Sequence, residues 1–346
     1  MKTLRLSVSL NPASDDPAIL QAAEIIRRGG LVAFPTETVY GLGANALDAK
    51  AVASIFEAKQ RPSWDPVIVH VDGLDMLKSL VTDWPDTAEL LSRGFMPGPL
   101  TLLLPKRGIV PPECTAGRDK VGVRFPAHPV AQALIRTAGV PIAAPSANRF
   151  GATSPTDADH VLRDLYGVID AVLDAGPCEV GVESTVIDPS LDPPTVYRPG
   201  GISREQIEAV VGPIRLVEST LSTDVPPDGL ESPGLGVRHY APRANLHLAY
   251  GEADLFDLAA DAASRHQRVG IMLPTGWDIR GSLDQSVVIY RWAAIDDFES
   301  LARRLYHGLR WLDQQNVHAI LCPVPKPEGL GLAIYDRLIR AAAEQP

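Results

Sequence analysis

Several residue types that would indicate a secreted or membrane protein are scarce in this sequence. The three cysteines, Cys114, Cys178 and Cys322, form no CxxC pair and have no metal-ligand spacing, so we expect buried, reduced thiols. No apolar run approaches the roughly 20 residues of a membrane span, and the N-terminus has no basic-then-apolar signal peptide. The sequence therefore predicts a cytoplasmic protein without a membrane segment.

Positive charge is also in short supply. The chain has 32 Lys and Arg residues against 42 Asp and Glu residues, which gives a formal net charge of -10. Proteins that hold nucleic acid over a broad surface neutralise phosphates with Lys and Arg, so this balance argues against an extended basic face. Any contact with RNA should be local or transient.

The length and composition instead describe two ordinary packed domains. A chain of 346 residues exceeds what one hydrophobic core usually supports. Apolar residues make up 45% and charged residues 21%, which is typical of a globular protein and not of a disordered one.

The first 212 residues predict a mixed α/β sheet. Residues 15–28 have helical periodicity, with Asp15 or Asp16 as the cap, Pro17 in the first turn and Gly29 at the stop. Further helices are predicted at 48–59, 129–138 and 203–212, and strands at 31–34, 67–71, 100–104, 121–125, 141–144, 171–173, 185–187 and 195–197. The alternation is not strictly βαβ, so a twisted mixed sheet is favoured over a doubly wound one.

The character of the chain changes after this region. Residues 213–243 contain Pro226-Pro227 and Pro233-Gly234 and keep no apolar stripe, which indicates a linker. Residues 244–346 alternate strands near 245–249, 269–273, 287–290 and 319–322 with helices at 254–266, 296–315 and 329–343. This pattern predicts a second, smaller, Rossmann-like parallel α/β domain.

Polar segments follow one predicted strand and one predicted helix in the first domain. The turn 35–43 (PTETVYGLG) presents hydroxyls and backbone N–H groups where open α/β sheets bind ligands, although an ordinary turn has the same composition. Lys59 and Arg61 could hold different oxygens of a polyphosphate, but cations at a helix C-terminus are also favoured by the helix dipole alone. His70 lies in an apolar strand, where a satisfied core histidine is the more common case.

Three more segments carry similar groups. The segment 145–155 (PSANRFGATSP) could donate to a phosphate or ribose, or form Asx and Ser turns without a ligand. Arg124 lies in an apolar strand and requires an anionic partner, which could be a ligand or an internal Asp or Glu. Ser184 precedes a strand, and Arg198 ends the next one.

These residues suit binding of an anion better than covalent catalysis, because no Cys–His, Ser–His–Asp or paired-carboxylate arrangement stands out. The sequence has no P-loop and no GxGxxG after a strand. A nucleotide would therefore require an unusual site. Composition and spacing alone predict an anion-binding α/β protein.

The order of the motifs adds a resemblance. PTETVYGLG, KQRP followed by IVH, VGVRFP, APSAN, ESTVID and YRPGG together resemble the catalytic domain of the threonylcarbamoyl-AMP synthases. The linker stretch SPGLGVRHYAP (232–242) and the following domain resemble the longer, two-domain members. The resemblance implies a catalytic domain with the fold of dihydroxybutanone-phosphate synthase over residues 1–212, a linker and possible active-site lid over 213–243, and a C-terminal α/β domain over 244–346.

The resemblance also implies a role for each matching residue. The tetrad that holds ATP would be Lys59, Arg61, Ser146 and Asn148, with further ATP contacts from Ser63, Lys120, Ala144, Ser154, Arg198 and His239. Threonine would be held by Thr36, Tyr40, His70, Arg124 and Ser184, with its carboxylate on Arg124. Arg238, His239 and Tyr240 of the linker could close over the nucleotide.

The implied enzyme is a nucleotidyltransferase that joins L-threonine, bicarbonate and ATP into threonylcarbamoyl-AMP and pyrophosphate for tRNA modification. The threonine amine would capture CO2 from bicarbonate as a carbamate, whose oxygen would attack the α-phosphate. Lys59, Arg61, Arg198 and Mg²⁺ would neutralise the reacting anions. The Mg²⁺ would arrive with ATP, no carboxylate is nominated as its ligand, and tRNA would be reached only through downstream transferase proteins.

Two departures from the family pattern and two alternatives accompany this prediction. Gln60 stands where the family often has Gly, and Leu235-Gly236-Val237 replaces a more basic or aromatic stretch. A related domain makes carbamoyl-adenylate during hydrogenase maturation, but those proteins carry cysteine clusters that this chain lacks. A non-catalytic RNA-binding module is disfavoured by the net acidity and by the complete tetrad.

Overall fold

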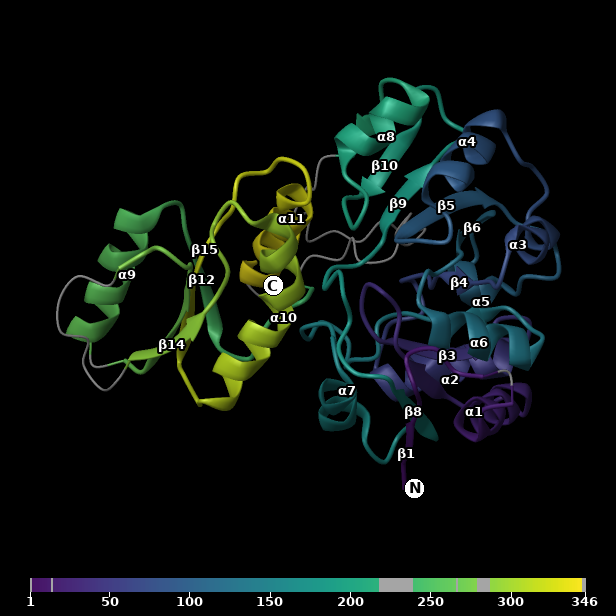
Figure 1. Cartoon of the computed structure of the whole chain (residues 1–346), viewed down its shortest axis with the longest axis horizontal. Coiled ribbons are helices and arrows are strands. Elements are labelled where there is room, and N and C mark those ends of the chain that lie inside the picture. The colour runs from purple at the N-terminus through teal and green to yellow at the C-terminus, as the bar shows by residue number, and fades with distance from the viewer. Residues whose placement is uncertain (1, 14, 218–238, 266, 279–286, 344–346) are drawn as a thin grey trace. The chain divides into compact units, whose positions relative to one another are not determined.

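The computed structural model describes residues 2–13, 15–217, 239–265, 267–278 and 287–343. The chain divides into two compact units. The first comprises Met1–Phe150 and Ser154–Gly236, and the second comprises Gly151–Thr153 and Val237–Pro346. Figure 1 shows the first unit in purple to teal and most of the second in green to yellow.

The first unit contains a large twisted mixed sheet, as its pattern predicts. Its described strands, in sheet order, are β1 (Leu4–Ser7), β8 (Ala171–Asp174), β2 (Val32–Phe34), β3 (Gly41–Asn45), β7 (Ile142–Ala143), β4 (Val69–His70), β6 (Lys120–Arg124), β5 (Leu100–Pro105), β9 (Thr185–Asp188), β10 (Thr195–Arg198) and β11 (Arg215–Leu216). Parallel pairs such as β4 with β6 stand beside antiparallel pairs such as β5 with β6. Strand β11 lies inside the range predicted as linker.

Helices cover this sheet on both faces. They are α1 (Pro17–Arg27), α2 (Ala49–Lys59), α3 (Leu74–Leu80), α4 (Asp86–Phe95), α5 (Pro112–Thr115), α6 (Pro129–Ala138), α7 (Ala158–Leu165) and α8 (Arg204–Val211). Side chains alternate across β2: Val32 and Phe34 pack in one core cluster with α1 and α6, whereas Ala33 packs in the other with α2. Helix α1 has the predicted ends, because Asp16 caps it and Gly29 follows it with φ 81°.

The sequence predicted a single turn over residues 35–43, and the structure differs from this prediction. The chain turns at residues 35–40 and then runs back along β2 as strand β3, with Phe34 paired to Gly41. A Cβ at Gly43 would lie 2.8 Å from both the Phe34 ring and the Ile142 side chain. Glycine therefore allows β3 to lie against its neighbours, and the two glycines are strand residues.

The second unit contains a parallel sheet, as predicted for a small α/β domain. Its described strands, in sheet order, are β12 (Asn245–Ala249), β15 (Ala319–Pro323), β13 (Val269–Leu273) and β14 (Val287–Arg291), and its helices are α9 (Glu252–Ser264), α10 (Phe298–Gln314) and α11 (Gly331–Ala342). Every recorded strand pair in it is parallel. No helix in the described ranges of the chain is long and apolar enough to cross a membrane.

The segment Gly151–Thr153 belongs to this second unit through backbone contacts. The amide of Ala241 donates to the carbonyl oxygen of Gly151 at 2.9 Å, and Ala152 forms a β-bridge with Ala241. The Arg310 guanidinium donates to the carbonyl oxygen of Thr153. The second unit thus includes three residues from the middle of the sequence.

Candidate functional site

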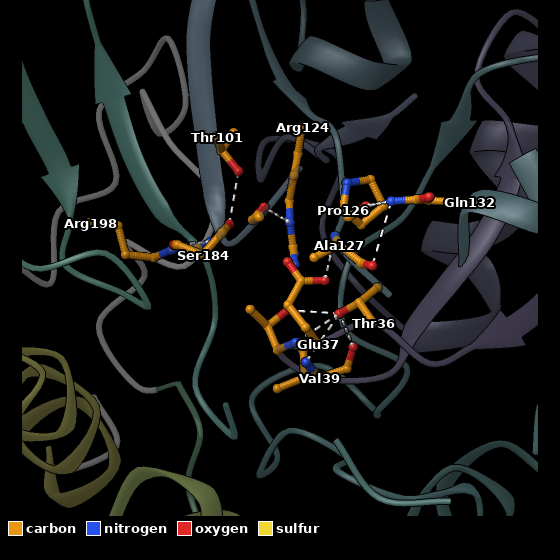
Figure 2. A network of polar contacts seen from close by, with 12 residues as sticks. Thr36, Glu37, Val39, Thr101, Arg124, Pro126, Ala127, Gln132, Ser184 and Arg198 are labelled. Carbon is orange, nitrogen blue, oxygen red and sulfur yellow. Dashed lines mark hydrogen bonds and ion pairs between the residues drawn. The ribbon is translucent and has the colours of Figure 1, made fainter. Parts of the chain in front are cut away.

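The turn after β2 is held together by its own hydroxyls. Thr36 Oγ1 donates to the Val39 carbonyl at 2.7 Å and accepts from the amides of Thr38 and Val39. Figure 2 shows Thr36 beside Glu37 and Val39. The hydroxyl of Tyr40 donates to the Gly176 carbonyl at 2.7 Å, and burial raises the pKa of Tyr40 far above its usual value. Thr36 and Tyr40 are therefore buried and rigidly placed at the end of β2.

Lys59 brings three of the four predicted tetrad residues together. It ends α2 and is 1% exposed, and its Nζ donates to the carbonyl oxygens of Ser146 and Asn148, both at 2.5 Å. The Ser146 segment in turn pairs with Gly41 across the sheet, and the Ala147 amide donates to the Tyr40 carbonyl at 2.8 Å. The ammonium of Lys59 thus lies close to the residues of the turn after β2.

Arg61, the fourth member, is ion-paired inside the protein. Its Nη2 lies 2.8 Å from Asp65 Oδ1 and donates to the Pro66 carbonyl at 2.7 Å, and both charged side chains are nearly inaccessible. Its guanidinium lies 5.9 Å from the centre of the Phe150 ring, and the Phe150 amide donates to the Lys59 carbonyl. Phe150 thereby connects Arg61 to Lys59, another member of the tetrad. Ser63, two residues further on, is exposed.

Gln60 sits between the two cations in a left-handed conformation. Its φ is 54°, which L side chains seldom adopt and glycine adopts without strain. This geometry explains why a glycine suits the position. The residue is exposed, so the substitution leaves the flanking Lys59 and Arg61 in place.

The anionic partner of Arg124 is Glu37, a residue that we did not nominate from the sequence. Arg124 Nη2 donates to Glu37 Oε1 at 2.6 Å, and Glu37 Oε2 accepts from the Ala127 amide at 3.1 Å. Arg124 is 4% exposed and Glu37 is 6% exposed. Figure 2 shows the Glu37 carboxylate between the Arg124 guanidinium and Ala127. The need for a partner was predictable, but only the folded turn shows that Glu37 meets it.

His70 lies beside Arg124 on the adjacent parallel strand, where the two residues are in register. It is 3% exposed, and its ring stands at a right angle to that of Phe34, with 6.1 Å between ring centres. Burial and the nearby charge of Arg124 lower its pKa to about 3, so the imidazole is neutral near pH 7. Within the described residues, its Nδ1 atom has no hydrogen-bond partner.

Ser184 and Arg198 form a neighbouring polar group. Arg198 donates through Nη2 to the Ser184 carbonyl at 3.0 Å and to its hydroxyl at 3.1 Å, and Ser184 Oγ lies 2.8 Å from Thr101 Oγ1. A Cβ at Gly200 would lie 2.3 Å from the backbone carbon of Ser184. Only glycine allows this approach, which places Arg198 against Ser184, as Figure 2 shows.

Ser154 and Ala144 also lie in the interior of the first unit. Ser154 Oγ donates to Glu183 Oε1 at 2.6 Å, so Glu183 is a second buried carboxylate that sequence reasoning missed. The backbone amide of Ala144 donates to the Ile68 carbonyl at 2.8 Å, which connects the end of β7 to the strand of His70. Both contacts involve groups within one or two residues of other predicted site residues.

Lys120 is the predicted residue that the structure places apart. It begins β6, whereas Arg124 ends it, and four residues of a strand span roughly 13 Å. Its Nζ is paired with Asp188 Oδ2 and lies 2.9 Å from Ser190 Oγ. Lys120, Asp188 and Tyr197 line a cavity of about 250 Å³.

The end of the linker is described only from His239 onward. The predicted contact residue Arg238 and the stretch 232–237 lie outside the described residues. The ring of His239 stacks on that of Tyr240 with 4.6 Å between centres, and Arg337 lies 5.0 Å from the centre of the Tyr240 ring. These contacts all lie within the second unit.

Each buried carboxylate among the site residues is already engaged by a protein group: Asp65 by Arg61, Glu37 by Arg124, and Glu183 by Ser154. The mixed sheet and the buried cations at its strand ends are typical of α/β proteins that bind small anions.

Comparison with known proteins identifies the family. The family model described as "Telomere recombination" matches residues 24–200, and the one for the C-terminal domain of threonylcarbamoyl-AMP synthase matches residues 202–343. The chain is 45% identical over 326 residues to a threonylcarbamoyl-AMP synthase of Pyrococcus abyssi, with 93% of each protein covered, and 42% identical over 346 residues to that of Bacillus subtilis, with 99% of this chain and 98% of the relative covered. The chain belongs to the threonylcarbamoyl-AMP synthase family.

A solved structure agrees with this assignment. The crystal structure of P. abyssi Sua5 complexed with L-threonine matches with a TM-score of 0.90 and 42% identity, and 98% of both chains is covered. The Escherichia coli YciO structure matches 57% of this chain with a TM-score of 0.51 and 26% identity. The first similarity extends over the two-domain chain, as the motif order predicted.

Proposed function

We propose that this chain catalyses the formation of threonylcarbamoyl-AMP and pyrophosphate from L-threonine, bicarbonate and ATP. The observation that carries the proposal is the full-length similarity of this chain to synthases of that name. The chain also contains every residue of the predicted tetrad. The buried cations at neighbouring strand ends support it, because all three substrates are anionic or carry a carboxylate.

The residues we assign to threonine are Arg124, His70, Thr36, Tyr40 and Ser184. They come from β4, β6 and the segments before β3 and β9, and Arg124 is the cation among them. The Nη1 group of Arg124 makes no hydrogen bond within the described part of the chain, so it is available for a carboxylate. The hydroxyls of Thr36 and Ser184 would orient the rest of the amino acid.

Lys59, Arg61, Ser146 and Asn148 are assigned to the phosphates of ATP, with support from Arg198 and Ser154. Threonine carbamate and ATP repel each other, so catalysis depends on holding both anions in line and on neutralising the charge. Magnesium would enter with ATP and stabilise the pyrophosphate that leaves. The protein would bind and orient the substrates, and none of its side chains would act as a nucleophile.

Four finer points remain proposals. The first domain would share its fold with dihydroxybutanone-phosphate synthase. The adenylate would pass to downstream transferase proteins that modify tRNA, and the reaction would take place in the cytoplasm. The lid formed by Arg238, His239 and Tyr240 also stays a prediction.

The direct test measures pyrophosphate release from ATP in the presence of Mg²⁺. We expect release only when threonine and bicarbonate are both supplied. Release that persists when either is omitted contradicts the proposal. Carbamoyl phosphate in place of both substrates tests the carbamoyl-adenylate alternative, and it should support no release.

A further inference from the structure

The Arg124–Glu37 ion pair lies in the interior of the first unit. The two side chains meet at 2.6 Å and are 5% and 8% exposed. A buried ion pair is seldom a source of net stability, because desolvation of the two charges offsets their attraction. A contribution to the stability of the fold therefore does not by itself explain why an ion pair is buried at this position.

Both members of the pair retain hydrogen-bonding capacity. Glu37 accepts one hydrogen bond on each oxygen, from Arg124 and from the Ala127 amide, and each oxygen can accept another. Arg124 uses Nε on the Gly98 carbonyl and Nη2 on Glu37. The structure records no acceptor for its Nη1 in the described ranges.

A second unfilled group lies next to the pair. His70 is in register with Arg124 on the adjacent strand, and its buried Nδ1 makes no well-formed hydrogen bond within the described residues, although the backbone of Ile68 and Ile142 lies near the ring. A polar atom that is buried without a partner is energetically unfavourable, and it is commonly satisfied by a ligand or an ordered water. The pair and the imidazole together point to a polar ligand that binds beside them.

The charges of the pair match those of a free amino acid. Arg124 with Glu37 has no net charge, and a zwitterion that binds with its carboxylate on Arg124 and its ammonium on Glu37 leaves the buried site neutral. A substrate with only a carboxylate would bring an uncompensated negative charge into the same environment, which is strongly unfavourable. The pair is thus complementary to a zwitterion and not to a simple anion.

We propose that Glu37 binds the ammonium group of the amino-acid substrate and makes the site selective for zwitterions. This inference rests on the proposed function, in which Arg124 takes the carboxylate. Glu37 would then act as a specificity-determining residue and not only as a brace for Arg124.

The test compares L-threonine with its deaminated analogue, the 2,3-dihydroxybutanoate of matching stereochemistry, in which a hydroxyl replaces the ammonium. The Michaelis constant for threonine and the inhibition constant of the analogue are measured for the wild type and for Glu37→Gln. A charged hydrogen bond lost from a buried site corresponds to roughly a tenfold to hundredfold weaker binding. We expect threonine to weaken by that factor in the variant, while the analogue changes less than about threefold.

The opposite patterns overturn the proposal. If Glu37 only braces Arg124, threonine and the analogue weaken in parallel, because both carry the carboxylate. If the analogue binds the wild type as tightly as threonine does, zwitterion recognition is also contradicted, and that measurement needs no variant. Pyrophosphate release that does not require threonine would instead contradict the proposed function itself.

Two further variants control for folding and for charge. Glu37→Asp keeps the carboxylate, so it should retain the preference for threonine over the analogue even if both bind more weakly. Glu89→Gln removes a partly buried, ion-paired carboxylate of α4 that lies near Trp84, Lys78 and Arg93. It should leave both constants unchanged. Thermal unfolding and the Michaelis constant for ATP are measured for each variant.

Discussion

Lys59 and Asn148 are separated by 89 residues in the sequence and are joined by a hydrogen bond of 2.5 Å from the Lys59 ammonium to the Asn148 carbonyl. A second bond from the same ammonium reaches the carbonyl of Ser146. One buried cation therefore fixes the backbone of the segment from which two predicted phosphate contacts arise. Its charge and its position both matter for the proposed reaction.

Replacing Lys59 with Met should abolish most of the activity. The variant keeps the length of the side chain but removes the ammonium, so we expect pyrophosphate release to fall by at least about a hundredfold, as for other lost electrostatic contacts to a transition state. Stability should fall by about 2 kcal/mol because two charged hydrogen bonds are lost. Lys50→Met, an exposed position on the same helix, is the matched control. Full activity in the Lys59 variant would exclude the assigned role.

Arg61 should affect stability as well as activity. Arg61→Ala leaves the buried Asp65 carboxylate without its ion pair, and we expect a loss of about 3 kcal/mol in the free energy of unfolding. Asp65→Asn in the same chain should restore much of that loss but not the activity. Urea unfolding and pyrophosphate release distinguish the two effects. The exposed Arg204–Glu208 pair is the comparison, and Arg204→Ala should change the stability by less than about 1 kcal/mol.

The neutral His70 should make the protein sensitive to acid. Its pKa is about 3 in the folded state and about 6.5 in an unfolded chain, so between these values the unfolded state binds the extra proton. The stability from this group is complete above pH 6.5 and is lost as the pH falls toward 3, by up to about 1.4 kcal/mol per pH unit. Urea unfolding at pH 7 and pH 5 should show a smaller difference for His70→Asn than for the wild type. If the change in stability between pH 7 and pH 5 is equal in the two proteins, the assignment of His70 as a neutral, buried imidazole is contradicted.

Gly200 should tolerate no side chain. An Ala Cβ at this position would collide with the backbone of Ser184 and Thr185 at 2.3 to 2.4 Å, which no side-chain rotation relieves. We expect Gly200→Ala to destabilise the protein by about 3 kcal/mol and to displace Arg198 from Ser184. Gly108→Ala is the control, because a Cβ there meets no heavy atom within 4 Å. Urea unfolding of both variants measures the difference, and equal stability would contradict the close approach.

Local signals predicted some elements closely. Helix α1 followed from its cap at Asp16, the proline after it and Gly29, which all act within a few residues. Local signals could not explain the glycines of β3. Glycine is required at position 43 because the Phe34 ring and the side chain of Ile142, which is distant in the sequence, leave no room for a Cβ. Propensity alone favours a turn for such residues.

In the candidate site, too, local signals predicted some features, whereas others depend on residues that are distant in the sequence. Burial of Arg124 required an anion, and the sequence left a ligand and an internal carboxylate as equal alternatives. The choice of Glu37 depends on a turn that brings Glu37 against Arg124, although 87 residues separate them in the sequence. The sequence likewise did not predict Asp65 as the partner of Arg61. The dipole of the preceding helix already explained a cation at the helix C-terminus without an ion pair.

The grouping of Gly151–Thr153 with the second unit has a consequence for dissecting the protein. A single cut in the linker would not yield two complete pieces, because the C-terminal fragment would lack the backbone that Ala241 and Arg310 bind. The N-terminal fragment would carry that short loop with its carbonyl groups exposed to water. Because Asn148 and Ser154 flank the loop, fragments made at the apparent boundary are poor substitutes for the intact chain in any study of nucleotide binding.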